Sequence, residues 1–292
     1  MVIKVPATSA NLGPGFDALG LSLNLFNIIT INESPIFCIS LNGEGSQNLN
    51  LKKHNMFISI FNEITRKFDT KLPNFRFVFE NNIPFSRGLG SSSAVIVGAI
   101  ASAYKICGIK IDKNKILNEA LVYENHPDNI APAAFGGFVS SVIYKNSVIT
   151  QKSEIGEDIK AVVVIPDKQM QTRKSRTMLP KNFTIKECVT NLSHAAFLTS
   201  CFVKKDYKNL KFGCIDVMHE ELRMQNLPEL FEVRKIAYEN GALMSSLSGS
   251  GSSFLNIVYK DDAKNLAKIL SAKFPKFTVK ILDFDNGGFA FE

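Results

Sequence analysis

The sequence has few cysteines, and none of them form a close pair. Its five cysteines are scattered along the chain without any CxxC spacing: Cys38, Cys107, Cys188, Cys201 and Cys214. This distribution argues against a zinc site and is typical of a reducing compartment, where thiols stay free. Single cysteines usually serve as small core hydrophobes, so we expect structural thiols here.

Long apolar runs are also missing. The first residues, Met1–Gly13, lack the apolar stretch of a signal peptide. Nowhere do about 18 apolar residues follow one another, which argues against a membrane-spanning helix. The sequence therefore predicts a soluble, cytoplasmic protein without a membrane partner.

The positive charge is moderate and is not concentrated. Lysine and arginine number 34 against 27 aspartates and glutamates, a formal net charge of +7. This excess favours anionic ligands without choosing among nucleotide, nucleic acid and phosphorylated metabolite. The nearest approach to a basic block, Lys204–Lys211, is interpreted as the solvated face of a helix. Nothing in the charge pattern requires a nucleic-acid partner.

The length of 292 residues is sufficient for two domains, and 45% hydrophobic residues can form an ordinary core. Strands are expected at residues 2–5, 21–31, 36–41, 75–79, 138–143, 161–165, 253–259 and 278–282. Helices are expected at residues 56–68, 94–106, 113–123, 185–202, 207–218, 229–240 and 263–274. This mixture indicates an α+β protein with segregated layers. The polar stretch Lys145–Asp158 suggests domains at residues 1–150 and 151–292.

The most informative segment is the loop Pro84–Ser93, which ends in Gly-Leu-Gly-Ser-Ser-Ser and runs into an expected helix. Glycines let backbone N–H groups turn inward, and a helix N-terminus adds unpaired donors and a favourable dipole. Serine hydroxyls can bond phosphate oxygens or ligate Mg2+. The loop matches neither the Walker A pattern nor GxGxxG. The alternative is a serine-capped helix after a glycine turn.

A second segment of glycines and serines, Ser245–Ser253, precedes an apolar run. Two such segments in one chain suggest a single anionic ligand approached from both domains. The alternative is an ordinary glycine-rich turn before a strand.

Carboxylates follow the expected helix at residues 113–123. Glu124 stands just before His126-Pro-Asp-Asn129. A magnesium ion bound to nucleotide phosphates takes one or two carboxylates together with hydroxyl groups and water. Pro127 is expected to end the helix, which would place Asp128 in a turn. A turn with glutamate, histidine, aspartate and asparagine is typical of a functional site, although these residues also occur in ordinary turns.

Three blocks, in this order, resemble the superfamily of galactokinases, homoserine kinases and mevalonate kinases: Pro6–Gly20, Pro84–Ser93 and Leu247–Gly251. The resemblance spans nearly the whole chain. The first block, and the residues His126–Pro132 followed by two glycines, are similar to the homoserine kinase family in particular. The resemblance implies a two-domain kinase with a ribosomal-protein-like N-terminal α/β sandwich and a ferredoxin-like C-terminal α+β domain. It also implies a homodimer.

The resemblance implies a role for each matching residue. The ATP phosphates would be held by Pro84, Ser86, Arg87, Gly88, Leu89, Gly90, Ser91, Ser92 and Ser93, with Asn55 near the adenine. Ser92 and Glu124 would bind Mg2+. L-Homoserine would be bound by Asn11, Asp17, His126, Asn129, Arg176 and Arg223. Thr172, Arg176 and Asp128 would be the catalytic residues.

These roles suit a zwitterionic amino acid. Its ammonium group requires an acid, for which Asp17 is the candidate, and its carboxylate suits a guanidinium from Arg176 or Arg223. Alternatively, Asp17 caps a turn and the arginines are surface charges. The expected reaction is direct in-line transfer of the γ-phosphoryl group of ATP to a hydroxyl, a step in threonine synthesis. Because this chemistry depends mainly on positioning, it needs no strong base; Asp128 is the nearest candidate if one operates.

The sequence departs from the family pattern at three places. Ser252 replaces a proline, Ser93 an alanine, and Asn125 a glycine. Loss of the proline would loosen the loop without removing a ligand. Two competing hypotheses remain: a sister kinase of the superfamily acting on another alcohol, such as mevalonate, and a non-catalytic nucleic-acid-binding protein.

Overall fold

The structure, a computed structural model, describes residues 1–68, 71–170 and 172–292, and the side chains of residues 172–174 lie outside this description. Its first sheet has the order β11-β1-β2-β4-β3, with β5 and β6 joined to it through β2. These strands are β1 (Val2–Ala10), β2 (Leu19–Glu33), β3 (Cys38–Gly43), β4 (Phe75–Asn81), β5 (Phe138–Tyr144), β6 (Ser147–Ser153) and β11 (Ala290–Phe291). All neighbours in it are antiparallel except β3 and β4.

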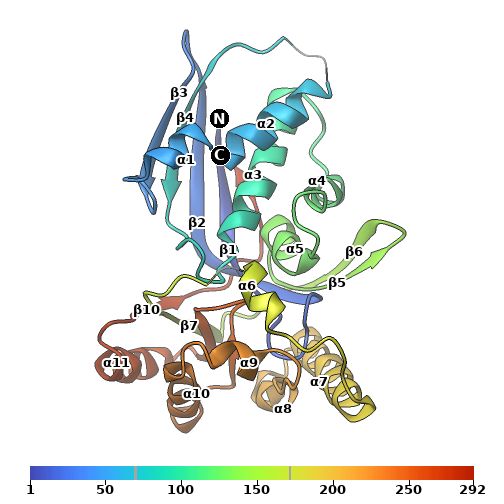
Figure 1. Ribbon diagram of the computed structural model, residues 1–292, viewed down its shortest axis with the longest axis vertical. Helices are drawn as coiled ribbons and strands as arrows, with labels where there is room; N and C mark the ends of the chain where they lie inside the picture. The colour runs from blue at the N-terminus through green and yellow to red at the C-terminus, as the bar shows by residue number, and fades with distance from the viewer. Residues whose placement is uncertain (69–70, 171) are drawn as a thin grey trace.

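Helices pack on this sheet through apolar residues that join its core (Figure 1). They are α2 (Met56–Arg66), α3 (Ser91–Ile106), α4 (Lys113–Ala120) and α5 (Pro127–Phe135), with the short α1 (Leu49–Lys53) beside β3. Alternating buried residues of β4 meet α2 in an aromatic cluster, in which Phe57 packs edge-to-face on Phe79 with ring centroids 5.3 Å apart. Small residues along α3 allow close packing on β1.

The second sheet is antiparallel, with the order β10-β7-β9-β8. Its strands are β7 (Ile159–Ile165), β8 (Met244–Leu247), β9 (Phe254–Tyr259) and β10 (Thr278–Leu282). Around it lie α6 (Thr172–Thr177), α7 (Ile185–Lys204), η1 (Tyr207–Asn209), α8 (Leu210–Gly213), α9 (Glu220–Met224), α10 (Glu229–Glu239) and α11 (Ala263–Lys273). A separate apolar core joins α10 and α11 to this sheet.

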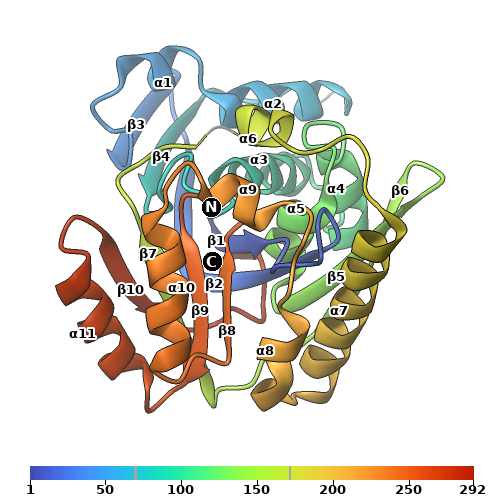
Figure 2. The same ribbon diagram turned by 60° about the horizontal axis from the view of Figure 1, so that its bottom comes forward.

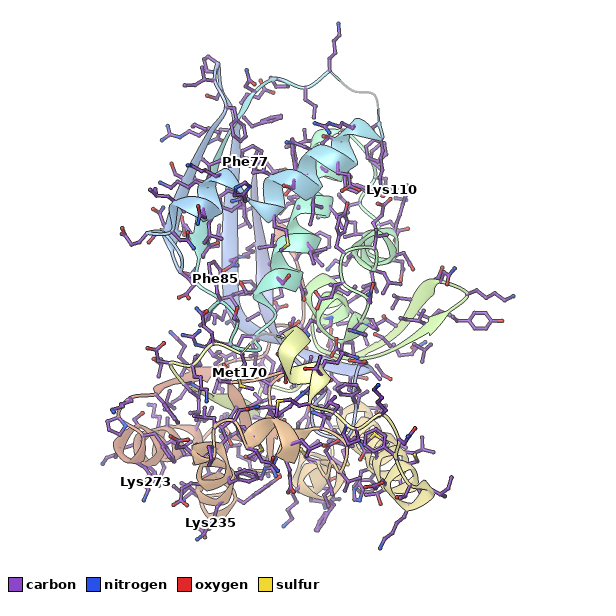
Figure 3. All side chains as sticks on the ribbon, viewed as in Figure 1. Phe77, Phe85, Lys110, Met170, Lys235 and Lys273 are labelled. Atoms are coloured by element: carbon purple, nitrogen blue, oxygen red, sulfur yellow. The ribbon has the colours of Figure 1, made fainter. Side chains whose placement is uncertain are left out.

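The two halves meet where the ends of β1, the loop before α3 and the segment after β7 come together, with α6 at the junction (Figures 1 and 2). Figure 3 places Met170 at this junction, and its backbone N–H donates to the Ser86 carbonyl over 2.8 Å. The rings of Phe138 on β5 and Phe202 on α7 stack 4.3 Å apart, so α7 packs on the first sheet. The two chain ends lie side by side because β11 pairs with β1.

Most expected elements are present, with corrections. The stretch expected to be a polar boundary contains β6, so the sheets divide after Ser153; the domain division at residue 150 remains a prediction. Residues 207–218 do not form one helix, because η1 and α8 end at Gly213. The expected helix 113–123 ends at Ala120. Within the described residues, no helix has the length and apolar character needed to cross a membrane.

The placement of Asp128 in a turn was wrong. Pro127 begins a new helix, α5, and Asp128 lies in its first turn. Proline is favoured at the first helical position because its missing N–H would have no partner there.

Candidate active site

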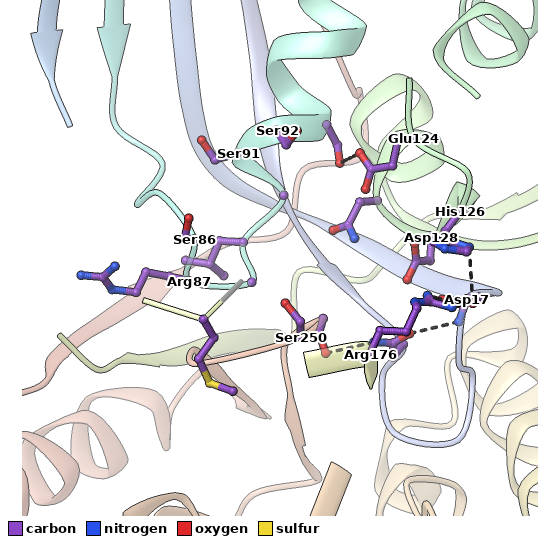
Figure 4. Close-up of a pocket in the computed structure, with 18 of the residues that line it drawn as sticks. Asp17, Ser86, Arg87, Ser91, Ser92, Glu124, His126, Asp128, Arg176 and Ser250 are labelled. Atoms are coloured by element: carbon purple, nitrogen blue, oxygen red, sulfur yellow. Dashed lines mark hydrogen bonds and ion pairs between the residues drawn. The ribbon is translucent and has the colours of Figure 1, made fainter. Parts of the chain in front are cut away.

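A cavity between the two sheets brings together nearly all of the predicted site residues (Figure 4). From the predicted set it is lined by Asn11, Asp17, Pro84, Ser86, Arg87, Gly88, Leu89, Gly90, Ser91, Ser92, Ser93, Glu124, His126, Asp128, Asn129, Arg176 and Arg223. Residues far apart in the sequence thus form one site. Sequence reasoning did not assign Met170, Gly249 and Ser250, which also line it. The second glycine-serine segment pointed to the latter two, whereas Met170 had no signal.

Glycines shape the phosphate-binding loop. Gly88 and Gly90 have φ angles of +78° and +66°, which favour glycine. A Cβ atom on Gly90 would lie 1.9 Å from the Thr8 hydroxyl, and one on Gly88 2.1 Å from the Ser248 carbonyl. Gly90 is the N-cap of α3, and because it has no side chain it leaves the first-turn N–H groups to a ligand. The three serines predicted for the loop form this first turn, so the loop ends in an anion-binding helix N-terminus.

The two glycine-serine segments contact each other, and both line the cavity. The Ser248 hydroxyl donates to the Gly88 carbonyl over 2.7 Å, and the Ser253 N–H donates to the Arg87 carbonyl over 2.9 Å. The Gly249 N–H donates to the Ala10 carbonyl at the end of β1 over 3.1 Å. The third block is therefore bonded to both other blocks.

The Arg87 side chain turns away from the centre of the cavity (Figure 4). Its Nε donates to the Pro166 carbonyl over 3.0 Å, and its Nη2 pairs with Asp167 at 2.7 Å. Its guanidinium thus links the loop to the segment after β7. The prediction that Arg87 binds ATP remains untested.

Glu124 and the first turn of α3 form a polar corner of the cavity. The Ser93 hydroxyl donates to Glu124 Oε2 over 2.6 Å, and burial raises the pKa of this carboxyl. One carboxylate beside serine hydroxyls and phosphate oxygens is a donor set that Mg2+ accepts. Among the described residues, no group of three or more His, Cys, Asp or Glu side chains could hold a metal by itself. These residues therefore fit a magnesium ion that arrives with a nucleotide.

At the other end of the cavity, Asp17 lies beside a guanidinium and beside the His126 ring, whose pKa is lowered by burial. Arg176 binds its carboxylate in a bidentate manner, at 3.0 and 2.6 Å, and His126 Nδ1 lies 3.4 Å away. Asp17 has a φ of +59°, and its N–H donates to the Asn11 side chain over 3.0 Å. The loop that joins β1 to β2 is held in this conformation by Asn11, which also donates to the Gly249 carbonyl.

Arg223 is a buried cation on α9. Its guanidinium and that of Arg176 lie 5.2 and 5.0 Å from the Phe16 ring centroid. Burial and repulsion by Arg176 lower the pKa of Arg223 to about 10, so it stays charged at neutral pH. In the part of the chain that the structure describes, its Nε has no hydrogen-bond partner. A buried guanidinium that lines a cavity favours an anionic ligand.

Asp128 lies between the two ends (Figure 4). Burial, with repulsion from Asp17 and Glu124, raises its pKa to about 8. The next residue, Asn129, accepts a hydrogen bond from the Thr8 hydroxyl over 2.8 Å, which ties α5 to β1.

Asn55 is a predicted residue that does not line this cavity. Asn55 is the N-cap of α2 and lines an adjoining pocket, largely apolar, that shares Ser86, Ser91 and Ser92 with the cavity. Leu51, Phe57 and Phe85 also line that pocket. An apolar pocket beside a phosphate loop suits a nucleobase. Thr172 begins α6, and its side chain lies outside the described residues.

A two-domain α+β fold with this loop defines a class of small-molecule kinases. The family model described as "GHMP kinases N terminal domain" matches residues 55–137, and "GHMP kinases C terminal" matches residues 204–276. The chain belongs to the GHMP kinase family. The predicted superfamily and the prediction of an ATP-dependent kinase are thereby confirmed.

Within this family the chain is similar to homoserine kinases. A curated protein of that name from Campylobacter concisus is 64% identical over 289 residues, covering 99% of this chain and 98% of the relative. Another, from Campylobacter jejuni subsp. doylei, is 61% identical over 289 residues, covering 99% of each chain. The crystal structure of homoserine kinase from Cytophaga hutchinsonii has a TM-score of 0.86 at 24% identity, covering 99% of this chain and 96% of that one. This likeness confirms the predicted fold.

Proposed function

We propose that this protein is a homoserine kinase, which transfers the γ-phosphoryl group of ATP to the side-chain hydroxyl of L-homoserine in threonine biosynthesis. One observation carries the proposal: a single cavity has an anion-binding helix N-terminus at one end and paired opposite charges at the other. The first end suits nucleotide phosphates, and the second suits the ammonium and carboxylate of an amino acid. The names of the nearly full-length relatives support the same substrate.

At the nucleotide end, the N–H groups at the start of α3 hold phosphate oxygens, and the pocket beside Asn55 holds the base. Ser92 and Glu124 are the proposed ligands of Mg2+, and Ser93 orients the Glu124 carboxylate. When bound, Mg2+ neutralises the phosphate charge.

At the amino-acid end, the Asp17–Arg176 ion pair supplies both charges that a zwitterion needs. Asp17 turns to the ammonium group, and Arg176 becomes available to the carboxylate. Arg223, which also lines the cavity, adds a second guanidinium for that carboxylate. His126 and Asn129 complete the wall on the side of α5.

The residues between the ends position the hydroxyl. Phosphoryl transfer depends on alignment and on neutralisation of charge, so a strong base is not needed. With a pKa of about 8, Asp128 is mostly protonated at neutral pH, which suits a hydrogen bond to a reacting oxygen better than removal of a proton. Thr172 and Arg176 remain proposed catalytic residues.

The test is ADP release by the purified protein with Mg2+-ATP and L-homoserine, with L-serine, L-threonine, mevalonate and galactose in parallel. We expect turnover with L-homoserine, and its loss in Glu124→Gln, which keeps the size of the side chain while removing the charge. Turnover with mevalonate alone would refute the substrate and favour a sister kinase. Steeply salt-dependent RNA binding without turnover would favour the nucleic-acid hypothesis.

A cytoplasmic location and a homodimer also belong to this proposal. The described cysteines are all free thiols, in keeping with a reducing compartment. Ile185, Val189 and Leu192 are exposed on α7, and a second copy could cover them.

A further inference from the structure

His219 is a buried histidine beneath the amino-acid end of the cavity, and none of the roles above uses it. It is the N-cap of α9, the helix that carries Arg223. Its Nε2 lies 2.8 Å from the Gly13 carbonyl, and its Nδ1 lies 3.1 Å from Arg223 Nη1. Its ring packs against Phe16 with centroids 5.0 Å apart. The ring thus contacts both the loop after β1 and the arginine on α9.

The partners of the ring determine its tautomer. A carbonyl oxygen only accepts, so Nε2 carries the proton; a guanidinium only donates, so Nδ1 offers its lone pair. Only the neutral Nε2–H form makes both bonds. Burial lowers the pKa of His219 to about 4, against the pull of Asp216 and with the repulsion of Arg223, so this form prevails at neutral pH.

The backbone of His219 is itself held in place. Asp216 Oδ2 accepts from the N–H groups of His219 and Glu220 over 2.7 and 2.8 Å. Asp216 Oδ1 accepts from the Asn191 side chain over 2.8 Å. Because its backbone is held in this way, the His219 ring can fix the position of a neighbouring side chain.

The residue in need of fixing is Arg223. Two guanidinium groups flank Phe16, repel each other and have long side chains that lose entropy when a ligand orders them. Nη1 of Arg223 is bonded to His219 and to the Gly249 carbonyl. Arg223 is thereby positioned before any ligand arrives.

We propose that His219 is a positioning residue, which holds Arg223 against the loop bearing Asp17 and so sets the spacing between the ammonium-binding and carboxylate-binding groups. This inference rests on the proposed function, because it takes Arg223 to bind the substrate carboxylate. Fixed spacing selects an α-amino acid by pre-organisation, which lowers the cost of binding.

Two conservative variants separate the contacts of the ring. In His219→Asn the amide oxygen can take the place of Nδ1 and accept from Arg223, while the bond to Gly13 is lost. In His219→Gln the amide N–H can reach the Gly13 carbonyl, while the acceptor for Arg223 is lost. We expect His219→Gln to raise the KM for L-homoserine about tenfold or more, as for a hydrogen bond to a charged group. The KM of His219→Asn for L-homoserine should lie closer to that of the native protein. Both variants should keep the native KM for ATP.

The matched control is His194→Gln. His194 lies on α7, and its Nδ1 also meets a backbone carbonyl, that of Phe212, at 2.7 Å. The His194→Gln variant should keep the native KM values for L-homoserine and ATP. Equal rises in both KM values, or a native KM for L-homoserine in His219→Gln, would overturn the positioning role. Absence of native turnover with L-homoserine would instead refute the proposed function.

A second measurement does not depend on activity. Long-range 1H–15N correlation spectra report the tautomer of each histidine ring, and loss of signals in His219→Gln assigns this one. We expect the neutral Nε2–H tautomer from about pH 6 to about pH 8. A charged ring or the Nδ1–H tautomer would contradict the geometry whether or not L-homoserine is the substrate.

Discussion

Asp128 shows how burial sets the behaviour of a single residue. Its side chain lies in the first turn of α5 and is only 5% exposed. Loss of hydration raises its pKa to about 8, and the neighbouring Asp17 and Glu124 add repulsion. An unfolded aspartate has a pKa of about 3.9. The folded protein therefore holds one proton more than the unfolded chain between these two values.

This proton makes stability depend on pH. The folded protein is favoured at low pH, and this advantage is lost as the pH rises from about 4 through about 8. Asp128→Asn cannot ionise, so its melting temperature should rise relative to that of the native protein between pH 5 and pH 8, reaching a gain of several degrees. Thermal unfolding of the ligand-free protein at a series of pH values measures this. Asp261→Asn, at an exposed position, is the control; a pH-independent difference for Asp128→Asn would refute the argument.

At the scale of the element, α3 has a glycine at each end. Gly90 precedes it and Gly108 follows it closely, with φ angles of +66° and +70°. A Cβ atom would meet the Thr8 hydroxyl at Gly90, whereas none of the described residues lies within 4 Å of one at Gly108. The two positions share a positive φ and differ in their surroundings.

This pair isolates the effect of packing at the phosphate-binding end. Gly108→Ala should lose only the free energy of a left-handed residue, about 1 kcal/mol. Gly90→Ala must also displace Thr8 and shift the start of α3, so it should lose more stability and raise the KM for ATP at least several-fold. Chemical denaturation and steady-state kinetics of both variants provide the comparison. If the two variants lost similar stability and had similar KM values for ATP, the positive φ alone would explain the need for glycine at position 90.

At the scale of the whole molecule, the phosphate loop is bonded to the second sheet. Arg87 reaches Pro166 and Asp167 after β7, and its carbonyl accepts from Ser253 before β9. The cavity therefore depends on the relative position of the two sheets, which share one large apolar core.

Removal of the Arg87 side chain should weaken the attachment of the phosphate loop to the second sheet, at the nucleotide end of the cavity. Arg87→Met leaves the Pro166 carbonyl without its donor, which should cost about 1–3 kcal/mol of stability. The KM for ATP should rise more than the KM for L-homoserine, because Asp17 and Arg223 have other supports. Arg76→Met, at an exposed position on β4, is the matched control. A larger rise in the KM for L-homoserine than in the KM for ATP would contradict this prediction.

The sequence by itself determined the local features of this protein. Glycines and serines at residues 88–93 predicted an anion-binding turn because their backbone and hydroxyl preferences act over a few residues. Apolar periodicity predicted α2 and β4 for the same reason. The three blocks, through their resemblance to a family, predicted the fold and nearly all the residues that line the cavity.

Only the tertiary structure decided which side chains meet. Arg176 pairs with Asp17 across 159 positions of sequence, Arg87 turns from the cavity to Asp167, and His219 joins Gly13 to Arg223. Hydrogen bonds and ion pairs form only between groups within a few ångströms, and the packing of two sheets determines those distances.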